Sequence, residues 1–250
     1  MRYPVPPIYE IYVPEPAAQL IAQAENQLVG QCMTRQGFRF EADPPNAESE
    51  RPTPFGYEEL PPSTPLETVS SETAPTTDSS AGPAGYERAL QGDHERRLTI
   101  EVEGMKVSAP ADGCRAEAQR RLRGNSRVEW MRLRIELFRI ENRALQSLEH
   151  DTRVRAATER WRACVNELGF TWSKPTEVQD SLPIGADPRS HPSTLADLKC
   201  KYRTNYLPDA YASLGEAQRR ELGPEPTALS RWRELFGAQE AAARQVLQGR

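Results

Sequence analysis

The strongest constraint on this chain is a motif that occurs twice: a cysteine, four further residues, and then Gly-Phe. The two copies span 32–38 and 164–170, and each lies at the end of a segment with helical periodicity. One more cysteine follows each copy, Cys114 in the first case and Cys200 in the second. This arrangement indicates an internal duplication in which each half is closed by one disulfide bond.

The cysteines have other possible roles, because a cysteine can also be free and buried, bind a metal, or act as a nucleophile. No Cys-x2-Cys or Cys-x2-His pair is present, and only three histidines are available to activate a thiol. Two disulfides are therefore favoured. Of the three possible pairings, the duplication favours Cys32–Cys114 and Cys164–Cys200. Loop-closure entropy gives each bond about 3–5 kcal/mol of unfolding free energy.

Composition limits the size of the core. The chain has 250 residues, of which 37% are hydrophobic and 27% charged, with 22 prolines, and its mean hydropathy is −0.72. Such a lean composition indicates that part of the chain does not pack into a core. The net charge of −4 does not by itself indicate a polyanionic partner, and we attribute the excess of arginine over lysine to codon bias.

We expect a mainly α-helical fold with two related disulfide-clamped halves, a small β-hairpin and a disordered acidic Pro-rich segment. Residues 1–40 supply the N-terminal helix of the first half, and residues 98–150 complete it with the β element and further helices. Residues 41–97 form an acidic Pro/Ser/Thr-rich linker that is partly disordered, because 63–80 almost lacks large apolar side chains. Residues 151–250 form the second helical half.

Glycines and polar residues mark the ends of the expected helices. Apolar spacing predicts a helix over 17–36, which ends where Gly37 adopts a left-handed conformation and Phe38 folds back on the last turn. Ser126 and Glu129 have the spacing of a capping box for a long helix to about residue 150.

Later elements are predicted in the same way. Asp151 or Thr152 caps the next helix, and Ser193 or Thr194 caps another. Alternating apolar and polar residues over 98–107 predict a hairpin that turns at 103–104. Within the linker, an island at 55–60 is expected to dock on the fold, and 85–90 to form a short helix.

A second feature is the density of arginine between positions 115 and 143. A basic surface for nucleic acid, anionic lipid or wall polymer is one interpretation. The arginines do not share one stripe, however, and neighbours such as Arg132 and Glu136 can pair, so a solvated or internally paired surface is favoured. The nine are Arg115, Arg120, Arg121, Arg123, Arg127, Arg132, Arg134, Arg139 and Arg143.

Sequence motifs of catalysis are absent. There is no Gly-rich phosphate loop, no Gly-x-Ser-x-Gly and no His-Glu-x-x-His, and an acidic pair such as Glu101 and Glu103 is too common to indicate catalysis. We predict no catalytic residue, metal site or cofactor, and assign the histidines no role. Core packing is favoured over a ligand platform for seven aromatic residues: Trp130, Phe138, Trp161, Phe170, Trp172, Trp232 and Phe236.

The sequence also bears on compartment. No apolar run approaches the roughly 20 residues that span a bilayer, and the first residues lack the hydrophobic core of a signal peptide. The four cysteines nevertheless favour an oxidising compartment. We therefore expect export, through a leader that preceded Met1; a cytoplasmic location is the alternative.

Five motifs together resemble a group of uncharacterised exported proteins and lipoproteins of actinobacteria, over residues 17–248 apart from the linker. The resemblance implies export and disulfide formation, and it brings no activity and no catalytic residues. The motifs are Cys-Met-x3-Gly-Phe at 32–38, Gly-Cys-x-Ala-Glu-Ala-x3-Leu at 113–122, Trp-x2-Cys-x4-Gly-Phe at 161–170, Asp-x2-Cys at 197–200 and Trp-Arg-Glu-Leu at 232–235.

The leading functional hypothesis is a non-catalytic, extracytoplasmic helical binding or scaffold module at an actinobacterial cell envelope, with an envelope protein or wall polymer as its partner. One alternative is a cell-wall or peptide hydrolase with carboxylates from separate helices, which requires two carboxylates roughly 5–10 Å apart in a deep pocket. Another is a cytosolic regulatory or nucleic-acid-binding protein that uses the Arg-rich helices.

Overall fold

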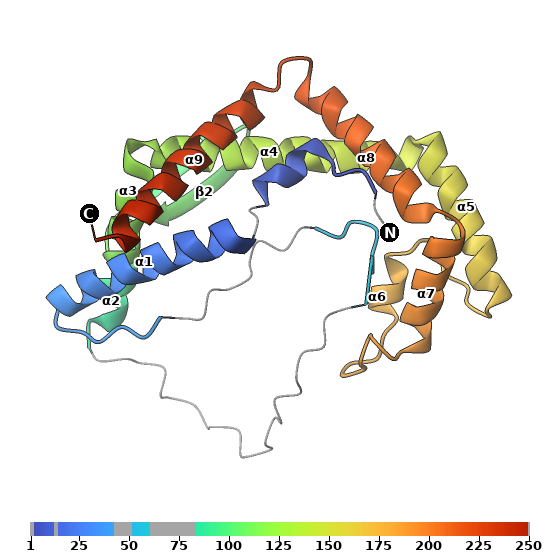
Figure 1. Ribbon diagram of the computed structural model, residues 1–250, viewed down its shortest axis with the longest axis horizontal. Coiled ribbons are helices and arrows are strands. Elements are labelled where there is room, and N and C mark those ends of the chain that lie inside the picture. The colour runs from blue at the N-terminus through green and yellow to red at the C-terminus, as the bar shows by residue number, and fades with distance from the viewer. Residues whose placement is uncertain (1–2, 13–14, 43–51, 61–83, 250) are drawn as a thin grey trace. The chain divides into compact units, whose positions relative to one another are not determined.

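The computed structural model describes residues 3–12, 15–42, 52–60 and 84–249 (Figure 1). These residues are mainly α-helical with one antiparallel hairpin, which is the predicted fold class. The helices are α1 (Glu15–Arg35), α2 (Tyr86–Gln91), α3 (Cys114–Arg123), α4 (Arg127–Ser147), α5 (Thr152–Glu167), α6 (Glu177–Asp180), α7 (Pro192–Arg203), α8 (Tyr206–Leu222) and α9 (Thr227–Leu247). The strands are β1 (Arg97–Val102) and β2 (Met105–Pro110), and short 3-10 helices span Pro7–Ile11, Gly124–Ser126 and Leu148–His150.

Most of the expected acidic linker lies outside the described residues, at 43–51 and 61–83. The disorder predicted there stays a prediction. The short helix expected at 85–90 is present as α2. None of the described helices combines the length and apolarity needed to cross a membrane.

The chain divides into two compact units, each built from separate segments. We call the unit that contains α5 to α8 the α5–α8 unit and the unit that contains the β-hairpin the hairpin unit. The α5–α8 unit falls within Met1–Tyr9, Arg51–Ala74 and Ile140–Pro224, and the hairpin unit within Glu10–Glu50, Pro75–Arg139 and Glu225–Arg250.

This division differs from the expected one. Residues 3–9 and 140–150, expected in the first half, belong to the α5–α8 unit, and α9, expected in the second half, belongs to the hairpin unit. In the structure α9 packs against α1 and α3 in the hairpin unit (Figure 1). The physical reason is a contact between small and aliphatic side chains, because Ala24, Leu122 and Ala243 are buried together where the three helices meet. Gly223-Pro224 separates α8 from α9, as the sequence predicts.

Each disulfide joins two helices that belong to the same unit. Cys32–Cys114 links α1 to α3 with the two Cα atoms 5.5 Å apart, and Cys164–Cys200 links α5 to α7 with the Cα atoms 5.7 Å apart. Both separations are ordinary for disulfides, and none of the four cysteines is free. These are the pairs predicted from the repeated motif.

The two copies of the repeated motif end their helices in the same way. In each copy the phenylalanine amide donates to the carbonyl five residues earlier, at 2.9 Å for Phe38 and 3.0 Å for Phe170. The preceding glycine amide donates to the carbonyl three residues earlier, at 3.0 Å in both copies. Gly37 and Gly169 have φ values of 84° and 87°, so the motif forms the Schellman cap that the sequence predicts.

The hairpin turns where the alternating pattern breaks. Ile100 pairs with Val107 in the antiparallel register, and the strands are joined at Glu103-Gly104. Both turn residues have positive φ, 46° for Glu103 and 82° for Gly104, as a two-residue hairpin of right-handed twist requires.

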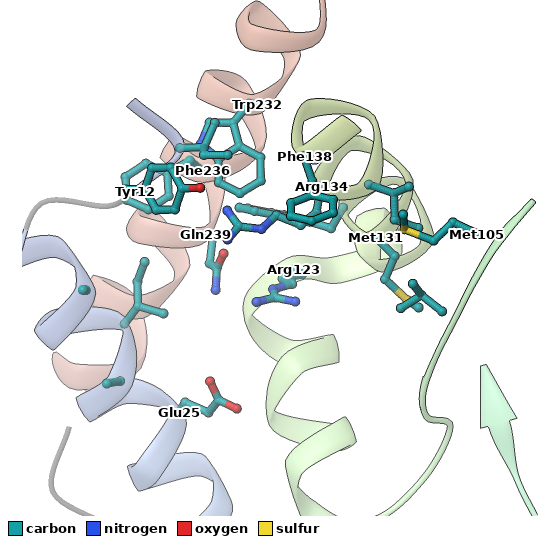
Figure 2. Close-up of a pocket in the computed structure, with 17 residues that line it drawn as sticks. Tyr12, Glu25, Met105, Arg123, Met131, Arg134, Phe138, Trp232, Phe236 and Gln239 are labelled. Atoms are coloured by element: carbon teal, nitrogen blue, oxygen red, sulfur yellow. The ribbon is translucent and has the colours of Figure 1, made fainter. Parts of the chain in front are cut away.

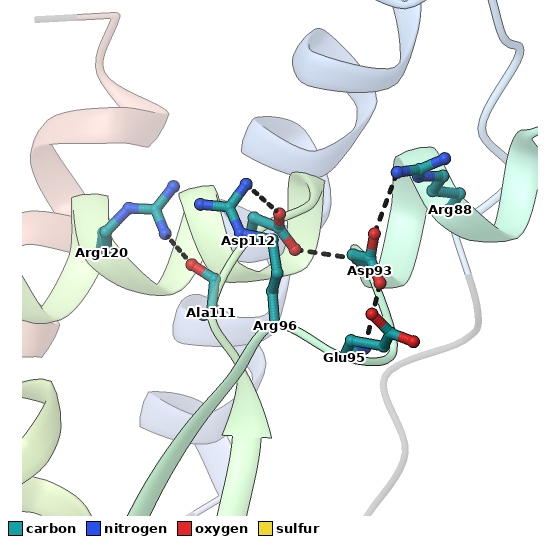
Figure 3. Close-up of polar contacts among 7 residues, drawn as sticks. All are labelled: Arg88, Asp93, Glu95, Arg96, Ala111, Asp112 and Arg120. Atoms are coloured by element: carbon teal, nitrogen blue, oxygen red, sulfur yellow. Dashed lines mark hydrogen bonds and ion pairs between the residues drawn. The ribbon is translucent and has the colours of Figure 1, made fainter.

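A polar network fixes the base of the hairpin (Figure 3). Asp112 accepts a hydrogen bond from the backbone N–H of Asp93 at 2.9 Å and pairs with Arg96 at 2.9 Å. The backbone N–H of Glu95, and then Arg88, hold the pKa of Asp93 below its ordinary value. Because Arg88 lies on α2 and Asp112 lies two residues before α3, the network ties both helices to the strand ends.

In the α5–α8 unit, helices α5, α7 and α8 pack around aromatic side chains. Trp161 is fully buried. Phe55 is also buried, with its ring centroid 5.0 Å from that of Tyr211 and 6.1 Å from that of Tyr206. The island expected at 55–60 therefore docks on α8.

Two predicted helix caps differ in outcome. Asp151 caps α5 by accepting a hydrogen bond from the backbone N–H of Val154 at 2.9 Å, as predicted. The prediction of Ser193 or Thr194 as the cap of α7 is wrong. The His191 side chain occupies that position and its Nδ1 accepts from the backbone N–H of Ser193 at 3.3 Å, a role that the sequence analysis did not assign.

The predicted capping box at Ser126 and Glu129 is also wrong. The Ser126 hydroxyl donates to the carbonyl oxygen of Arg123 at 2.6 Å, because a 3-10 turn precedes α4 directly. Glu129 instead pairs with Arg231 of α9, with N–O distances of 2.5 and 2.8 Å. A tertiary ion pair takes the place of the predicted local hydrogen bonds.

Candidate functional site

The hairpin unit contains a pocket with a volume of about 600 Å³ (Figure 2). Its lining comes from α1, the end of α3, the first part of α4, β2, α9 and residues 11–12. All of these segments belong to the one unit. The volume is typical of sites that enclose a small organic molecule.

Helical periodicity explains which side chains reach the pocket. On α4, Met131, Ile135 and Phe138 line it at spacings of three and four residues, which places them on one face. On α9, Trp232 and Phe236 are one turn apart and also line it. The apolar faces of two amphipathic helices thus form the walls.

The pocket has a rigid aromatic part and an adaptable part. Trp130 and Trp232 are in edge contact, with ring centroids 4.3 Å apart and an interplanar angle of 72°. Met105 and Met131 line the pocket as well, and the flexible thioether side chain adapts to ligands of different shape. Phe138 also lines the pocket and is 46% exposed.

Two arginines lie against aromatic rings of the pocket. The Cζ of Arg123 is 5.0 Å from the ring centroid of Trp130. The Cζ of Arg134 is 5.4 Å from the ring centroid of Tyr12 and 5.9 Å from that of Trp232. Figure 2 shows both arginine side chains between the Tyr12–Trp232 side of the pocket and the methionines. These contacts hold positive charge beside apolar walls.

The electrostatics of the pocket centre on Arg123. Burial lowers the pKa of its guanidinium, the carboxylate of Glu25 opposes this shift, and the positive charge of Arg127 adds to it. An arginine stays protonated in proteins despite such a shift. The pocket therefore contains a partly desolvated cation.

Two donors at the pocket have no acceptor. Arg123 Nε and Trp130 Nε1 are buried and make no hydrogen bond to any described residue. Buried N–H groups usually have a partner, because leaving one unpaired costs about 1–3 kcal/mol. Both residues line the pocket.

The pocket does not supply the carboxylate pair that the hydrolase alternative requires. Among the lining residues Glu25 is the one carboxylate. Nor does any group of three or more His, Cys, Asp or Glu side chains in the described part of the chain have the arrangement to hold a metal ion. The lining is suited to binding an apolar molecule that carries an acceptor.

A second cluster of ionisable groups lies in the core of the α5–α8 unit. Lys201 is 1% exposed and its Nζ donates to Asp197 at 2.7 Å and to the backbone carbonyl of Tyr57 at 2.6 Å. Asp197 also accepts from the indole N–H of Trp161 at 2.9 Å. Burial raises the pKa of Asp197 to about 6, against the opposing effect of Lys201, and burial lowers the pKa of Lys201. This closed cluster fastens the docked island to α7.

Most of the arginines between 115 and 143 have internal partners, as the favoured interpretation holds. Arg120 and Arg127 donate to backbone carbonyls at 2.8 and 2.6 Å, and Arg139 pairs with Glu103. Arg143 pairs with Glu221 at 2.7 Å. Arg123 and Arg134 lie over aromatic rings.

The structure assigns different roles to the cysteines and the aromatic residues that the sequence analysis singled out. The cysteines serve as disulfides and lie outside the pocket lining. Of the seven aromatic residues, Trp161, Trp130 and Trp232 are buried as predicted. Trp130 and Trp232 also border the pocket, together with Phe138 and Phe236.

Among the lining residues that sequence reasoning missed are Tyr12, Glu25 and Gln239, each an isolated polar or aromatic residue within a different segment. The repeated spacing of apolar residues along α4 and α9 is the signal that could have located the walls. Comparison of the chain with known protein families, curated proteins and solved structures found no match.

Proposed function

We propose that this chain is a non-catalytic binding module of an oxidising, extracytoplasmic compartment, and that the pocket of the hairpin unit holds a small apolar ligand. The observation that carries the proposal is the 600 Å³ pocket with walls of aromatic and methionine side chains. A pocket of this size admits a small molecule or one group of a larger envelope component, so it favours such a ligand over an extended wall polymer.

The two disulfides support the compartment. Disulfides persist in exported proteins and are rare where thiols are kept reduced. The chain is also lean in hydrophobic residues, at 37%, so covalent closure adds stability that a larger core would otherwise supply. The cell envelope is the location consistent with the resemblance of its motifs.

Binding of a neutral apolar dye tests the pocket. N-phenyl-1-naphthylamine is weakly fluorescent in water and bright in an apolar site, so titration of the oxidised protein is expected to give saturable fluorescence with one site per chain. Trp130 and Trp232 lie in the wall, so tryptophan emission should be quenched over the same concentration range.

A pocket-filling variant locates the dye. Ala22 lines the pocket on α1, and Ala22→Trp puts a large side chain into the space. Ala241→Trp introduces the same side chain at an exposed position of α9 and is the matched control. Loss of dye binding in Ala22→Trp alone supports the proposal. Equal binding by both variants, or no saturable binding by the native chain, refutes it.

The compartment is tested separately by counting thiols in the protein from its native host, isolated without reductant. We expect a mass lower than that of the reduced chain by four hydrogens, two for each bond. Peptides linking Cys32 to Cys114 and Cys164 to Cys200 should be recovered. Four alkylatable thiols would place the protein in a reducing compartment and refute that part of the proposal.

A further inference from the structure

The pocket has a polar centre that an entirely apolar ligand would leave unused. We infer that its ligand is an apolar monocarboxylate, whose carboxylate is bound by Arg123 Nε and the indole N–H of Trp130. This inference rests on the proposed function and specifies the ligand class.

The first argument is hydrogen bonding. Arg123 Nε and Trp130 Nε1 are buried and lack an acceptor among the described residues. Trp130 is only 7% exposed, so leaving its indole N–H unpaired is costly. The Arg123 Cζ lies 5.0 Å from the Trp130 ring centroid, so the two unused donors belong to groups in contact. A carboxylate presents two acceptor oxygens and can satisfy both donors.

The second argument is charge. The ionised side chains of the lining are Arg123, Arg134 and Glu25, which leaves one net positive charge. Burial lowers the pKa of Arg123, which reflects the cost of keeping this cation away from water. A monoanion neutralises the lining, whereas a dianion such as a phosphate monoester would leave excess negative charge beside Glu25 in an apolar site.

The third argument is the rest of the lining. Arg134 is held against the rings of Tyr12 and Trp232, and the remaining walls include Met131 and Phe236. Such walls offer contact area to an alkyl or aryl body and no further charged group. The ligand therefore combines one anionic head with an apolar body.

Three decyl compounds test the selectivity by displacement of N-phenyl-1-naphthylamine. Decanoate is a monoanion, 1-decanol is neutral, and decyl phosphate is a dianion at about pH 8. Decanoate should displace the dye at the lowest concentration, by about tenfold or more relative to decanol, as expected for a charge-assisted hydrogen bond. If decanol or decyl phosphate displaces the dye as well as decanoate does, the inference is overturned.

Variants assign the selectivity to the donors. Arg123→Met replaces the guanidinium with an unbranched apolar side chain. It should weaken decanoate binding by about ten- to a hundredfold. Trp130→Phe keeps a ring and removes the N–H, and should weaken it by about two- to tenfold. Arg121→Met, at an exposed position of the same helix as Arg123, is the control. It should change the affinity of the protein for neither decanoate nor the dye.

The outcomes distinguish the two proposals. If the native chain binds the dye but Arg123→Met does not change the affinity for decanoate, the apolar pocket is supported and the carboxylate site is overturned. No dye binding overturns both. Because the decanoate-to-decanol comparison uses the native chain alone, it decides the inference even if Arg123→Met fails to fold.

Discussion

Asp197 is a buried carboxyl group whose pKa is raised toward neutral pH. Its pKa is raised to about 6 by burial, from an ordinary value of 3.8, although Lys201 opposes the shift. Between these values the folded state holds more protons than the unfolded state, so the contribution of Asp197 to the free energy of unfolding falls as pH rises from about 4 to about 6. Above that range Asp197 is ionised, and its attraction to Lys201 and its hydrogen bonds to Lys201 and Trp161 oppose the cost of burial.

Replacing Asp197 should therefore reveal a pH-dependent difference. Asp197→Asn leaves Lys201 without its buried counter-ion and should cost about 3–5 kcal/mol. The stability advantage of the native chain over the variant should shrink as pH rises from about 4 to about 6. Urea unfolding at several pH values measures it. The control Asp209→Asn breaks the more exposed pair with Arg160 and should cost about 1 kcal/mol or less. If the native chain were more stable than Asp197→Asn by the same amount at all pH values, a pKa of about 6 for Asp197 would be contradicted.

At the scale of single elements, the glycine of each repeated motif can be tested directly. Gly37 and Gly169 have positive φ, and an added Cβ would meet nothing within 4 Å. The cost of Gly37→Ala and Gly169→Ala is thus backbone strain alone, about 1–2 kcal/mol each. Gly237→Ala, in the middle of α9 with similarly open space, should instead stabilise by about 0.5–1 kcal/mol. Thermal unfolding of all three variants measures this, and a common sign would show that the caps do not require glycine.

The elements predicted correctly are those determined within a few residues. Asp151 caps α5 through the N–H three residues ahead, and the turn at 103–104 follows from its own sequence and the alternation beside it. Ser126 and Glu129 satisfy the local pattern equally well, yet Glu129 pairs with Arg231 far along the chain. Local sequence cannot show which distant partner competes for a side chain.

The pocket was not predictable for the same reason. Its residues come from separated segments, and the individual lining residues Tyr12, Glu25 and Gln239 carry no local motif. Aromatic residues at helical spacing indicate burial without distinguishing a filled core from a hollow one. The repeated cysteine motif, in contrast, indicated two pairs because the same local pattern occurs twice.

For the whole molecule, the two disulfides should act on different units. Cys164–Cys200 belongs to the α5–α8 unit and Cys32–Cys114 to the hairpin unit. The double variant Cys164→Ala/Cys200→Ala should lose about 2–5 kcal/mol of unfolding free energy while the folded protein keeps its affinity for N-phenyl-1-naphthylamine. Circular dichroism follows the first quantity and dye titration the second.

The matched variant Cys32→Ala/Cys114→Ala removes the bond that joins α1 to α3, both of which line the pocket. It should weaken the dye affinity as well as the stability. Equal dye affinity in the two double variants would show that neither bond shapes the pocket.

The position of α9 in the hairpin unit has a consequence for biosynthesis. This helix is the last described element in chain order, yet it supplies Trp232, Phe236 and Gln239 to a pocket whose other walls lie much earlier in the chain. A chain that emerges from its N-terminus onward therefore holds α1, α3 and α4 with one apolar wall uncovered until α9 follows. The Cys32–Cys114 bond needs no residue of α9, so its oxidation can precede the arrival of that helix and keep α1 and α3 together while the pocket awaits its final wall.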